Sequence, residues 1–243
     1  ARIQCSNNLK QMSLAVINCS DTNQGLMPPG IGLYPSVQPT ANNSYASVFF
    51  HICPYMEQDN GYKATLQPSD PHGSNVGPGG SALPTYSPFW NNVTMNVKTL
   101  TCPADPTNTG RASGWTYGQS SYGYNALVFP VSWAPYSKYP ASLQDGTSNT
   151  MLFTEKEADC TQYWPDWGTT LFDAGYGQAT GPSSLFQVKP KPCSFNVASS
   201  GHSNGINVGL GDGSVRYVSQ GISGATWWFV ATPAGGEVLG SDW

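Results

Sequence analysis

The spacing of apolar residues changes from a helical period at the start of the chain to a strand period near its end. Near the start, apolar residues recur at steps of four, three, four and three, which places them on one helix face: Cys5, Leu9, Met12, Val16 and Cys19. The polar and glycine residues at 21–25 and the Pro-Pro-Gly run at 28–30 then end the pattern. We therefore expect an amphipathic helix over residues 1–20.

A second pattern predicts a β-hairpin in the last quarter of the chain. Ile206, Val208 and Leu210 alternate with small or polar residues, as in a strand with one buried face. Asp212 and Gly213 form a two-residue turn signal of the kind that needs positive φ, and alternation resumes after them. The hairpin is thus expected to close on the Asp-Gly pair.

The middle of the chain predicts short strands separated by long loops. Strands are expected over residues 95–101, 122–131 and 151–154, and a helix or a strand within residues 45–53. Residues 60–92 and 156–195 form two irregular inserts, and residues 227–230 form an apolar cluster without an assigned element. No repeat or linker divides residues 1–243. We therefore expect a single α+β domain, with the helix packed on an antiparallel sheet that carries two loop inserts.

Composition restricts the environment and the partners. Only 10% of the residues are charged, against about 25% in an average protein. Few charges with abundant Gly, Pro and aromatic residues indicate a loop-rich surface exposed outside the cell. The net charge is −4 and the basic residues are scattered, which argues against a nucleic-acid partner.

The start of the chain suggests that a preceding segment has been removed. No apolar run approaches the roughly 20 residues that a membrane span needs, and no signal peptide is visible. The helical pattern nevertheless begins abruptly at Ala1. We expect an upstream segment in the unprocessed protein.

The cysteines favour disulfides. The chain has six, with neither a C-x-x-C motif nor a Cys/His cluster at zinc spacing. An even count without metal spacing indicates an oxidising compartment, and buried free thiols are the alternative. Cys5 and Cys19 lie 14 positions apart on one expected helix, which separates them by about 21 Å and prevents them from pairing with each other.

Two chemical sites can be assembled from the sequence, and we favour neither. Ser148, His202 and Asp212 are the candidates for a hydrolase triad, but Ser148 lacks the Gly-x-Ser-x-Gly elbow, so we expect no enzyme activity. Asp145, Asn149 and Asp212 could supply oxygens to calcium. We prefer the interpretation that Asp145 and Asp212 make Asx-turn hydrogen bonds, and we expect no metal or other cofactor.

His202 and the loop aromatics each leave two interpretations open. His202 either binds a backbone carbonyl and fixes the approach to the hairpin, or makes a contact needed for export or assembly. Trp164 and Trp167 in the second insert either stack on sugar rings or a protein partner, or cap a small core.

The order of several short motifs resembles a large planctomycete family that combines a prepilin-type N-terminal cleavage and methylation segment with a domain catalogued as DUF1559. The family's H-X9-DG motif corresponds to His202 followed by Asp212 and Gly213. A second motif, at residues 145–150, contains Asp145, Gly146 and Asn149. The remaining motifs lie at residues 5–11, 28–30, 54–58, 102–105 and 235–240.

The resemblance implies a pilin-like fold and a structural function. Residues 1–20 would be the outer half of a long helix whose apolar half anchors the subunit in the inner membrane before assembly. The protein would then lie in the cell envelope or outside the cell. Through that helix it would associate with itself and with other pilin-like subunits, in a filament or a secretion-type pseudopilus. The alternative is a surface module that captures glycans or other macromolecules.

The resemblance also guides the disulfide pairing. Cys5 and Cys102 belong to the family pattern, so we pair them. Cys19 and Cys53 are additions to that pattern, and we pair those. Cys160 and Cys193 share the second insert and make the third pair. Sequence alone allows fifteen connectivities.

Overall fold

The computed structural model describes residues 1–69, 75–87, 97–109, 119–131, 136–160, 170–174 and 177–243. In chain order, with η denoting 3-10 helices, the elements are α1 (Arg2–Thr22), β1 (Ile31–Tyr34), β2 (Asn43–Ser47), α2 (Val48–His51), η1 (Cys53–Met56), α3 (Asp59–Lys63), β3 (Leu66–Gln67), β4 (Thr85–Tyr86), η2 (Lys98–Leu100), β5 (Tyr122–Asn125), β6 (Met151–Glu155), η3 (Ala158–Cys160), β7 (Thr170–Leu171), η5 (Gly181–Ser184), β8 (Gln187–Val188), β9 (Ser199–Ser200), β10 (Gly205–Leu210), β11 (Val215–Ser219) and α4 (Gly224–Ala231).

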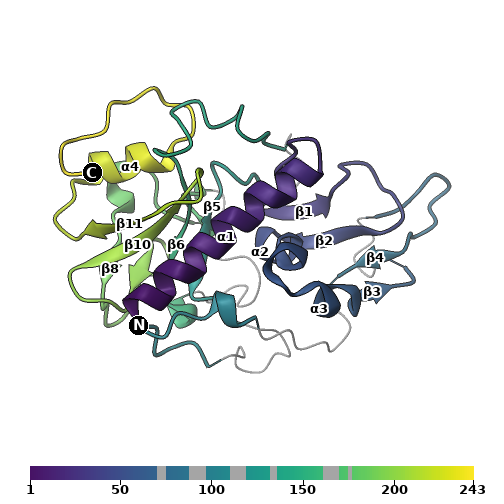
Figure 1. Ribbon diagram of the computed structural model, residues 1–243, viewed down its shortest axis with the longest axis horizontal. Helices are drawn as coiled ribbons and strands as arrows, with labels where there is room; N and C mark the ends of the chain where they lie inside the picture. The colour runs from purple at the N-terminus through teal and green to yellow at the C-terminus, as the bar shows by residue number, and fades with distance from the viewer. Residues whose placement is uncertain (70–74, 88–96, 110–118, 132–135, 161–169, 175–176) are drawn as a thin grey trace.

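The structure has two main sheets, and the long helix α1 crosses one face of the molecule (Figure 1). The helix lies over the larger sheet, and its C-terminal end reaches β1 of the smaller sheet. The larger sheet has the strand order β11-β10-β6-β5-β7, and its pairs are antiparallel except β5 with β7. The smaller sheet has the order β1-β2-β4-β3, and β8 pairs with β9 separately. The predicted α+β class, with an N-terminal helix packed on an antiparallel-rich sheet, is confirmed.

The buried face of α1 is the one that the apolar spacing predicts. Cys5, Leu9, Met12, Val16 and Cys19 are all fully buried. The helix lies mainly over β10 and also touches β6 and β11. Close contact requires a glycine in β10, because a Cβ at Gly209 would lie 2.7 Å from Ser13 Oγ.

Strand β10 is buried on both faces, so the prediction of a half-buried strand is wrong. Gly209 faces α1, whereas Ile206, Val208 and Leu210 belong to a second apolar cluster around Trp227 of α4. Helix α4 was missed in the sequence because its residues are apolar on all sides. Its start carries a usable signal, since Ser223 Oγ accepts a hydrogen bond from the backbone N–H of Thr226.

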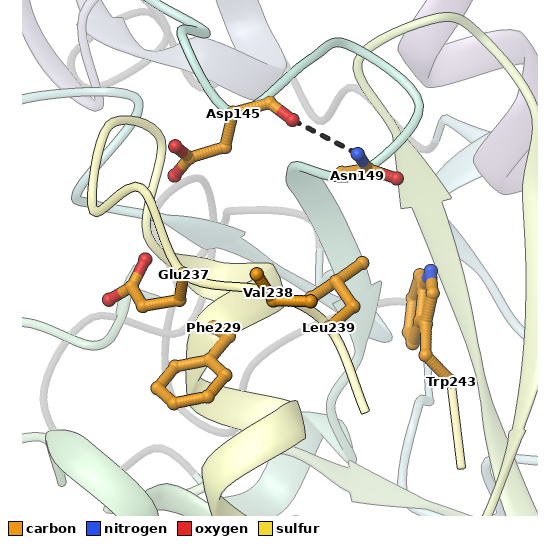
Figure 2. A pocket seen from close by; sticks show the side chains of 7 residues that line it. All are labelled: Asp145, Asn149, Phe229, Glu237, Val238, Leu239 and Trp243. Atoms are coloured by element: carbon orange, nitrogen blue, oxygen red, sulfur yellow. Dashed lines mark hydrogen bonds between the residues drawn. The ribbon is translucent and has the colours of Figure 1, made fainter. Parts of the chain in front are cut away.

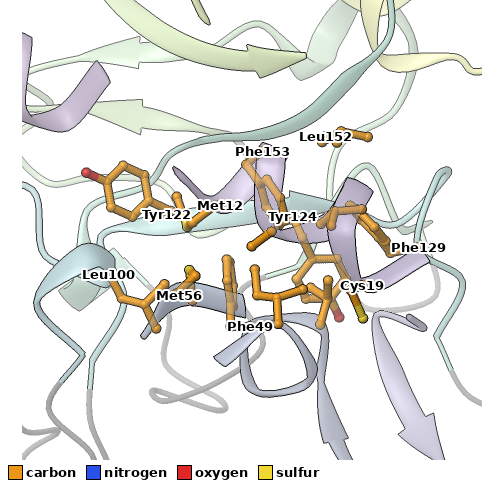
Figure 3. Close-up of a cluster of buried hydrophobic side chains, with 14 of the residues drawn as sticks. Met12, Cys19, Phe49, Met56, Leu100, Tyr122, Tyr124, Phe129, Leu152 and Phe153 are labelled. Carbon is orange, nitrogen blue, oxygen red and sulfur yellow. The ribbon is translucent and has the colours of Figure 1, made fainter. Parts of the chain in front are cut away.

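The first core fills the space between α1, α2 and the larger sheet (Figure 3). The Phe153 ring stacks on Phe49 at a centroid distance of 5.5 Å and on Phe129 at 5.3 Å. Tyr124 meets Phe49 edge to face at 5.9 Å. These rings join β5, β6 and α2 into one packed unit.

Several predicted elements differ from the structure. Residues 98–100 form a 3-10 helix where a strand was expected, and residues 45–53 contain both a strand and a helix. The strand expected over residues 122–131 ends at Asn125, because the Asn125 side chain turns to bond Met151 O, Ala231 O and the N–H of Leu127. The described parts of both inserts contain short strands and helical turns.

The hairpin is confirmed, but its turn has four residues where two were expected. Strands β10 and β11 are joined by residues 211–214. Asp212 Oδ1 accepts from both the N–H and the hydroxyl of Ser214, at 2.9 and 2.6 Å, and Gly213 adopts a φ of 83°. The predicted Asx-type bond at Asp212 is therefore present.

Two of the three predicted disulfides form. Cys5 bonds to Cys102 and Cys160 bonds to Cys193. The pairing of Cys19 with Cys53 is wrong, because both are free buried thiols. Each has its own acceptor in the core: Cys19 Sγ donates to the Tyr34 hydroxyl and Cys53 Sγ to the Phe49 carbonyl, both at 3.3 Å. Burial raises the pKa of Cys19 to about 11 and that of Cys53 further, which keeps both protonated.

A helix that crosses a bilayer needs about 20 predominantly apolar residues. Among the helices that the structure describes, none combines the length and the apolar character required.

We predict that Gly209→Leu disturbs the packing of α1 on β10. Because the added side chain overpacks this contact, the free energy of unfolding should fall by about 1–3 kcal/mol. Gly221→Leu is the matched control, because Gly221 is exposed and a Cβ there would have only Ser219 Oγ as a neighbour, at 3.7 Å. Urea unfolding followed by tryptophan fluorescence measures both. Equal losses in the two variants would contradict the assigned packing.

We also predict that acid destabilises the protein through His51. This side chain is buried with Nδ1 2.7 Å from Ser44 Oγ, and burial lowers its pKa from 6.5 to about 3. Between these values the unfolded chain binds a proton that the folded chain does not, so stability falls as the pH falls below 6.5. From pH 7.5 to 4.5 the loss at this residue is about 2–3 kcal/mol.

His51→Asn supplies the control for this pH effect, since Asn can replace Nδ1 but does not titrate. Urea unfolding of both proteins at pH 7.5 and 4.5 separates the contribution of His51 from that of the other acids and histidines. A variant that loses as much stability as the parent protein over this interval would show that His51 is not responsible.

Candidate functional site

A buried acid and a buried histidine meet beneath the N-terminal half of α1. Glu155 is the last residue of β6, and His202 precedes β10. His202 Nε2 lies 3.1 Å from Glu155 Oε1, with both side chains less than a tenth exposed. The histidine of the H-X9-DG spacing therefore binds a carboxylate, whereas a backbone carbonyl was expected.

The Glu155 carboxylate is held by three further donors. Asn207 Nδ2 donates to Oε1 at 2.6 Å, and the Asn207 backbone N–H lies 3.4 Å from Oε2. Ser200 Oγ donates to Oε2 at 2.7 Å and accepts the backbone N–H of His202 at 3.1 Å. A buried carboxylate requires such complete partnering, since an unpaired one costs several kcal/mol.

The Cys5–Cys102 disulfide lies against this pair. Cys102 Sγ is 3.8 Å from His202 Nε2. The loops can approach because residue 201 is glycine: a Cβ there would lie only 1.9 Å from the carbonyl oxygen of Ala104. The disulfide thus ties the start of α1 to the same point in the sheet where Glu155 and His202 meet.

Asn8 and Tyr122 complete the cluster from the helix side. Asn8 Nδ2 donates to Thr101 O at 2.9 Å and to the Tyr122 hydroxyl at 3.1 Å. Tyr122 pairs with Glu155 across β5 and β6. Burial raises the pKa of the Tyr122 phenol, so this hydroxyl remains protonated.

Lys156, the residue after Glu155, is a further buried titratable group. Its Nζ donates to the carbonyls of Ser194, Phe195 and Val197, at 2.7, 3.0 and 2.5 Å. Burial lowers its pKa to about 7. Sequence reasoning missed both Glu155 and Lys156, although two charged residues directly after the apolar run at 151–154 were a usable signal.

The segment at residues 145–150 holds the C-terminal segment of the chain. The Asp145 carboxylate accepts the backbone N–H groups of Gly235 and Gly236, both at 2.8 Å, which corrects the expected Asx turn at Asp145. Asn149 Nδ2 donates to Asp145 O at 3.0 Å, and Gly146 has a φ of 98°. Asn149 thus bonds to Asp145 within this segment, and Asp145 holds the backbone at Gly235, 90 positions further on.

A pocket of about 420 Å³ opens beside Asp145. Figure 2 shows the Asp145 and Glu237 carboxylates on one side of it and Trp243 on the other. Asn149, Phe229, Val238 and Leu239 complete the lining. The Asp145 oxygens are already used by backbone donors, which leaves Glu237 as the less constrained acid of the pocket.

The three residues of the candidate triad are not brought together as one group. Of the candidate calcium ligands, Asp145 and Asn149 line the same pocket, and the Asp212 backbone N–H donates to Thr147 O at 3.0 Å. His202 and Asp212 lie beyond opposite ends of the six-residue strand β10, which spans about 20 Å. Ser148 is exposed, and Asp212 is used by its own turn. Trp164 and Trp167 lie outside the described residues.

Two groups of described residues have the donor atoms for a metal. Cys5, Cys102, Glu155 and His202 form one, and Glu157, Cys160 and Cys193 form the other. In both groups the cysteines are joined as disulfides in this structure.

Comparison with protein families matches residues 1–224 to the family described as "Protein of unknown function (DUF1559)", so the chain belongs to that family. No curated protein and no solved structure matches the chain.

We predict that Asp145→Ala frees the C-terminal segment without unfolding the domain. The two lost bonds are charge-assisted and worth about 1.5–3 kcal/mol each, so hydrogen exchange at the Gly235 and Gly236 amides should rise by at least about tenfold. Asp212→Ala is the matched control, because the Asp212 carboxylate accepts its hydrogen bonds from Ser214 of its own turn. Unchanged exchange in Asp145→Ala would show that the carboxylate does not hold this segment.

Proposed function

We propose that this protein is a structural, pilin-like or pseudopilin-like subunit of a planctomycete cell envelope. In this proposal α1 packs against the same helix of other subunits in a filament or a secretion-type assembly. The observation that carries it is an apolar stripe on the outer face of α1.

The outer stripe consists of Ile3, Leu14 and Ile17. Ile3 is 77% exposed and Leu14 is 41% exposed, although both are large apolar residues. Ile17 is half-buried. At 3.6 residues per turn, these positions fall within about 60° of one another around the helix axis. Helices whose apolar side chains point outward on one side are suited to packing against other helices.

In this proposal α1 is the outer half of a longer helix whose apolar part anchors the subunit in the inner membrane. Near its start, the Arg2 guanidinium lies 4.9 Å from the centre of the Tyr217 ring of β11, which adds a contact between the helix and the larger sheet.

In this proposal the H-X9-DG motif seats the helix. Its histidine lies in the cluster that includes Cys5, near the start of α1. Its glycine meets one edge of the outer stripe, since a Cβ at Gly213 would lie 2.7 Å from Leu14 Cδ2 and 3.6 Å from Ile17 Cδ1, which leaves Ile3 as the most exposed residue of the stripe. Both ends of the motif therefore face α1, which supports a structural role for the spacing.

We predict that Ile3→Glu and Leu14→Glu in the full-length precursor abolish filament formation when the protein is produced with its prepilin peptidase and assembly machinery. A charge in the apolar interface is not compensated, so assembly fails while the exposed positions tolerate it in the monomer. Electron microscopy and recovery of sheared filaments measure the result.

Val37→Glu and Leu66→Glu are the matched controls. Both positions are large, apolar and 51% and 42% exposed, but they lie outside α1. Filaments should persist in these controls. A parent protein that stays monomeric with its own machinery would refute the proposal, as would normal filaments in both α1 variants.

A further inference from the structure

The Cys5–Cys102 disulfide, Glu155 and His202 bring together the donor atoms of a soft metal site. One atom from each side chain, either sulfur, carboxylate oxygen or imidazole nitrogen, lies within 4.8 Å of the other three. The four residues are 0%, 3%, 2% and 8% exposed, in the order named. They come from four separate segments, so no sequence spacing reveals the group.

We infer that this cluster has a second state, in which the reduced Cys5 and Cys102 thiolates, with Glu155 and His202, bind one divalent zinc ion. Disulfide and metal are then alternative crosslinks between α1 and the sheet. Zinc fits the donor set because it accepts thiolate, imidazole and carboxylate in four-coordinate sites.

The distances already approach a tetrahedral site. Zinc bonds of 2.0–2.3 Å place neighbouring ligand atoms about 3.3–3.8 Å apart. His202 Nε2 is 3.1 Å from Glu155 Oε1 and 3.8 Å from Cys102 Sγ. The main movement needed is separation of the two sulfurs from bonding distance, about 2.05 Å, to about 3.8 Å.

The surroundings supply the outer contacts that metal ligands need. Ser200 and Asn207 hold the Glu155 carboxylate in place, and Ser200 also fixes the backbone of His202. Such outer contacts orient ligands and typically contribute 10-fold to 100-fold to metal affinity. The same side chains that satisfy the buried carboxylate in the oxidised state therefore prepare it as a ligand.

The exchange balances with two components supplied from solution, a dithiol reductant and a zinc ion. A dithiol reductant gives two electrons and two protons to the Cys5–Cys102 bond and becomes a disulfide itself. Zinc then binds both sulfurs as thiolates, and the two thiol protons leave to solvent. His202 binds through Nε2, so its remaining proton resides on Nδ1.

The second group, Glu157, Cys160 and Cys193, is a weaker candidate. It offers three ligands without an imidazole, and Cys193 is only half-buried. Cys160→Ser/Cys193→Ser removes this group and its disulfide, so that bound zinc can be assigned to the Cys5 cluster.

The experiment uses this double variant, reduced with a phosphine and supplied with zinc during refolding and after it. We expect about one zinc ion per reduced chain and none per oxidised chain, measured by elemental analysis after desalting. Cobalt in place of zinc should show thiolate charge-transfer bands. Zinc should raise the melting temperature of the reduced protein only.

Further variants separate this site from adventitious binding. His202→Ala and Glu155→Gln should each weaken zinc binding by about tenfold or more. Cys19→Ser/Cys53→Ser, which removes the two free thiols, should leave it unchanged. Absence of zinc from the reduced chain in both preparations would overturn the inference. So would zinc binding that survives both ligand variants or that requires Cys19 and Cys53.

Discussion

The buried carboxylate of Glu155 sets a condition that the surrounding structure has to meet. An ionised acid in a protein interior is tolerated only when donors replace the water that it loses. Here the donors come from the loop at residues 200–202 and from Asn207 of β10. Strand β6, the start of β10 and the loop at residues 200–202 are therefore fixed relative to one another, and α1 is seated on that arrangement.

The seating of α1 depends on two contacts. Its N-terminal half is crosslinked to Cys102 next to the buried pair, and its middle approaches β10 so closely that only glycine fits at position 209. The larger sheet is covered on its other face by the cluster around Trp227. Strand β10 thus lies between α1 and this cluster, with Ile206, Val208 and Leu210 packed in the cluster and Gly209 facing α1.

The sequence predicted those features that depend on local periodicity. The α1 face and the hairpin strands could be read because period 3.6 and period 2 recur over enough residues. Helix α4 could not, because eight residues that are apolar all round show no period. The turn at residues 211–214 was misjudged because the Asp212 side chain extends it with its own hydrogen bonds.

The candidate site is formed by residues that lie far apart in the sequence, so the spacing of residues along the chain could not reveal it. His202 was found through its motif, but its partner Glu155 lies 47 positions earlier, and no spacing links the two residues. The disulfides show the same limit. Family position predicted Cys5 with Cys102 correctly, whereas shared absence from the family pattern was no reason for Cys19 to lie against Cys53. Each of those two thiols instead donates a hydrogen bond to a neighbouring oxygen in the first core.

Lys156 has a consequence for how the second insert can vary. Two interactions hold the base of the second insert, residues 156–195. One is the set of three hydrogen bonds from Lys156 Nζ to backbone carbonyls, and the other is the Cys160–Cys193 disulfide. Both fasteners, the Lys156 hydrogen bonds and the disulfide, join the beginning of the second insert to its end. They therefore hold the base of the insert whatever sequence its outer loops carry. The insert is nevertheless part of the fold, because its strand β7 pairs with β5 and its residues Phe172 and Phe186 pack in the cluster around Trp227. Exchanging the insert would therefore remove an edge strand and part of the second core, whereas substitutions that spare these contacts and the two fasteners leave the sheet beneath it unchanged.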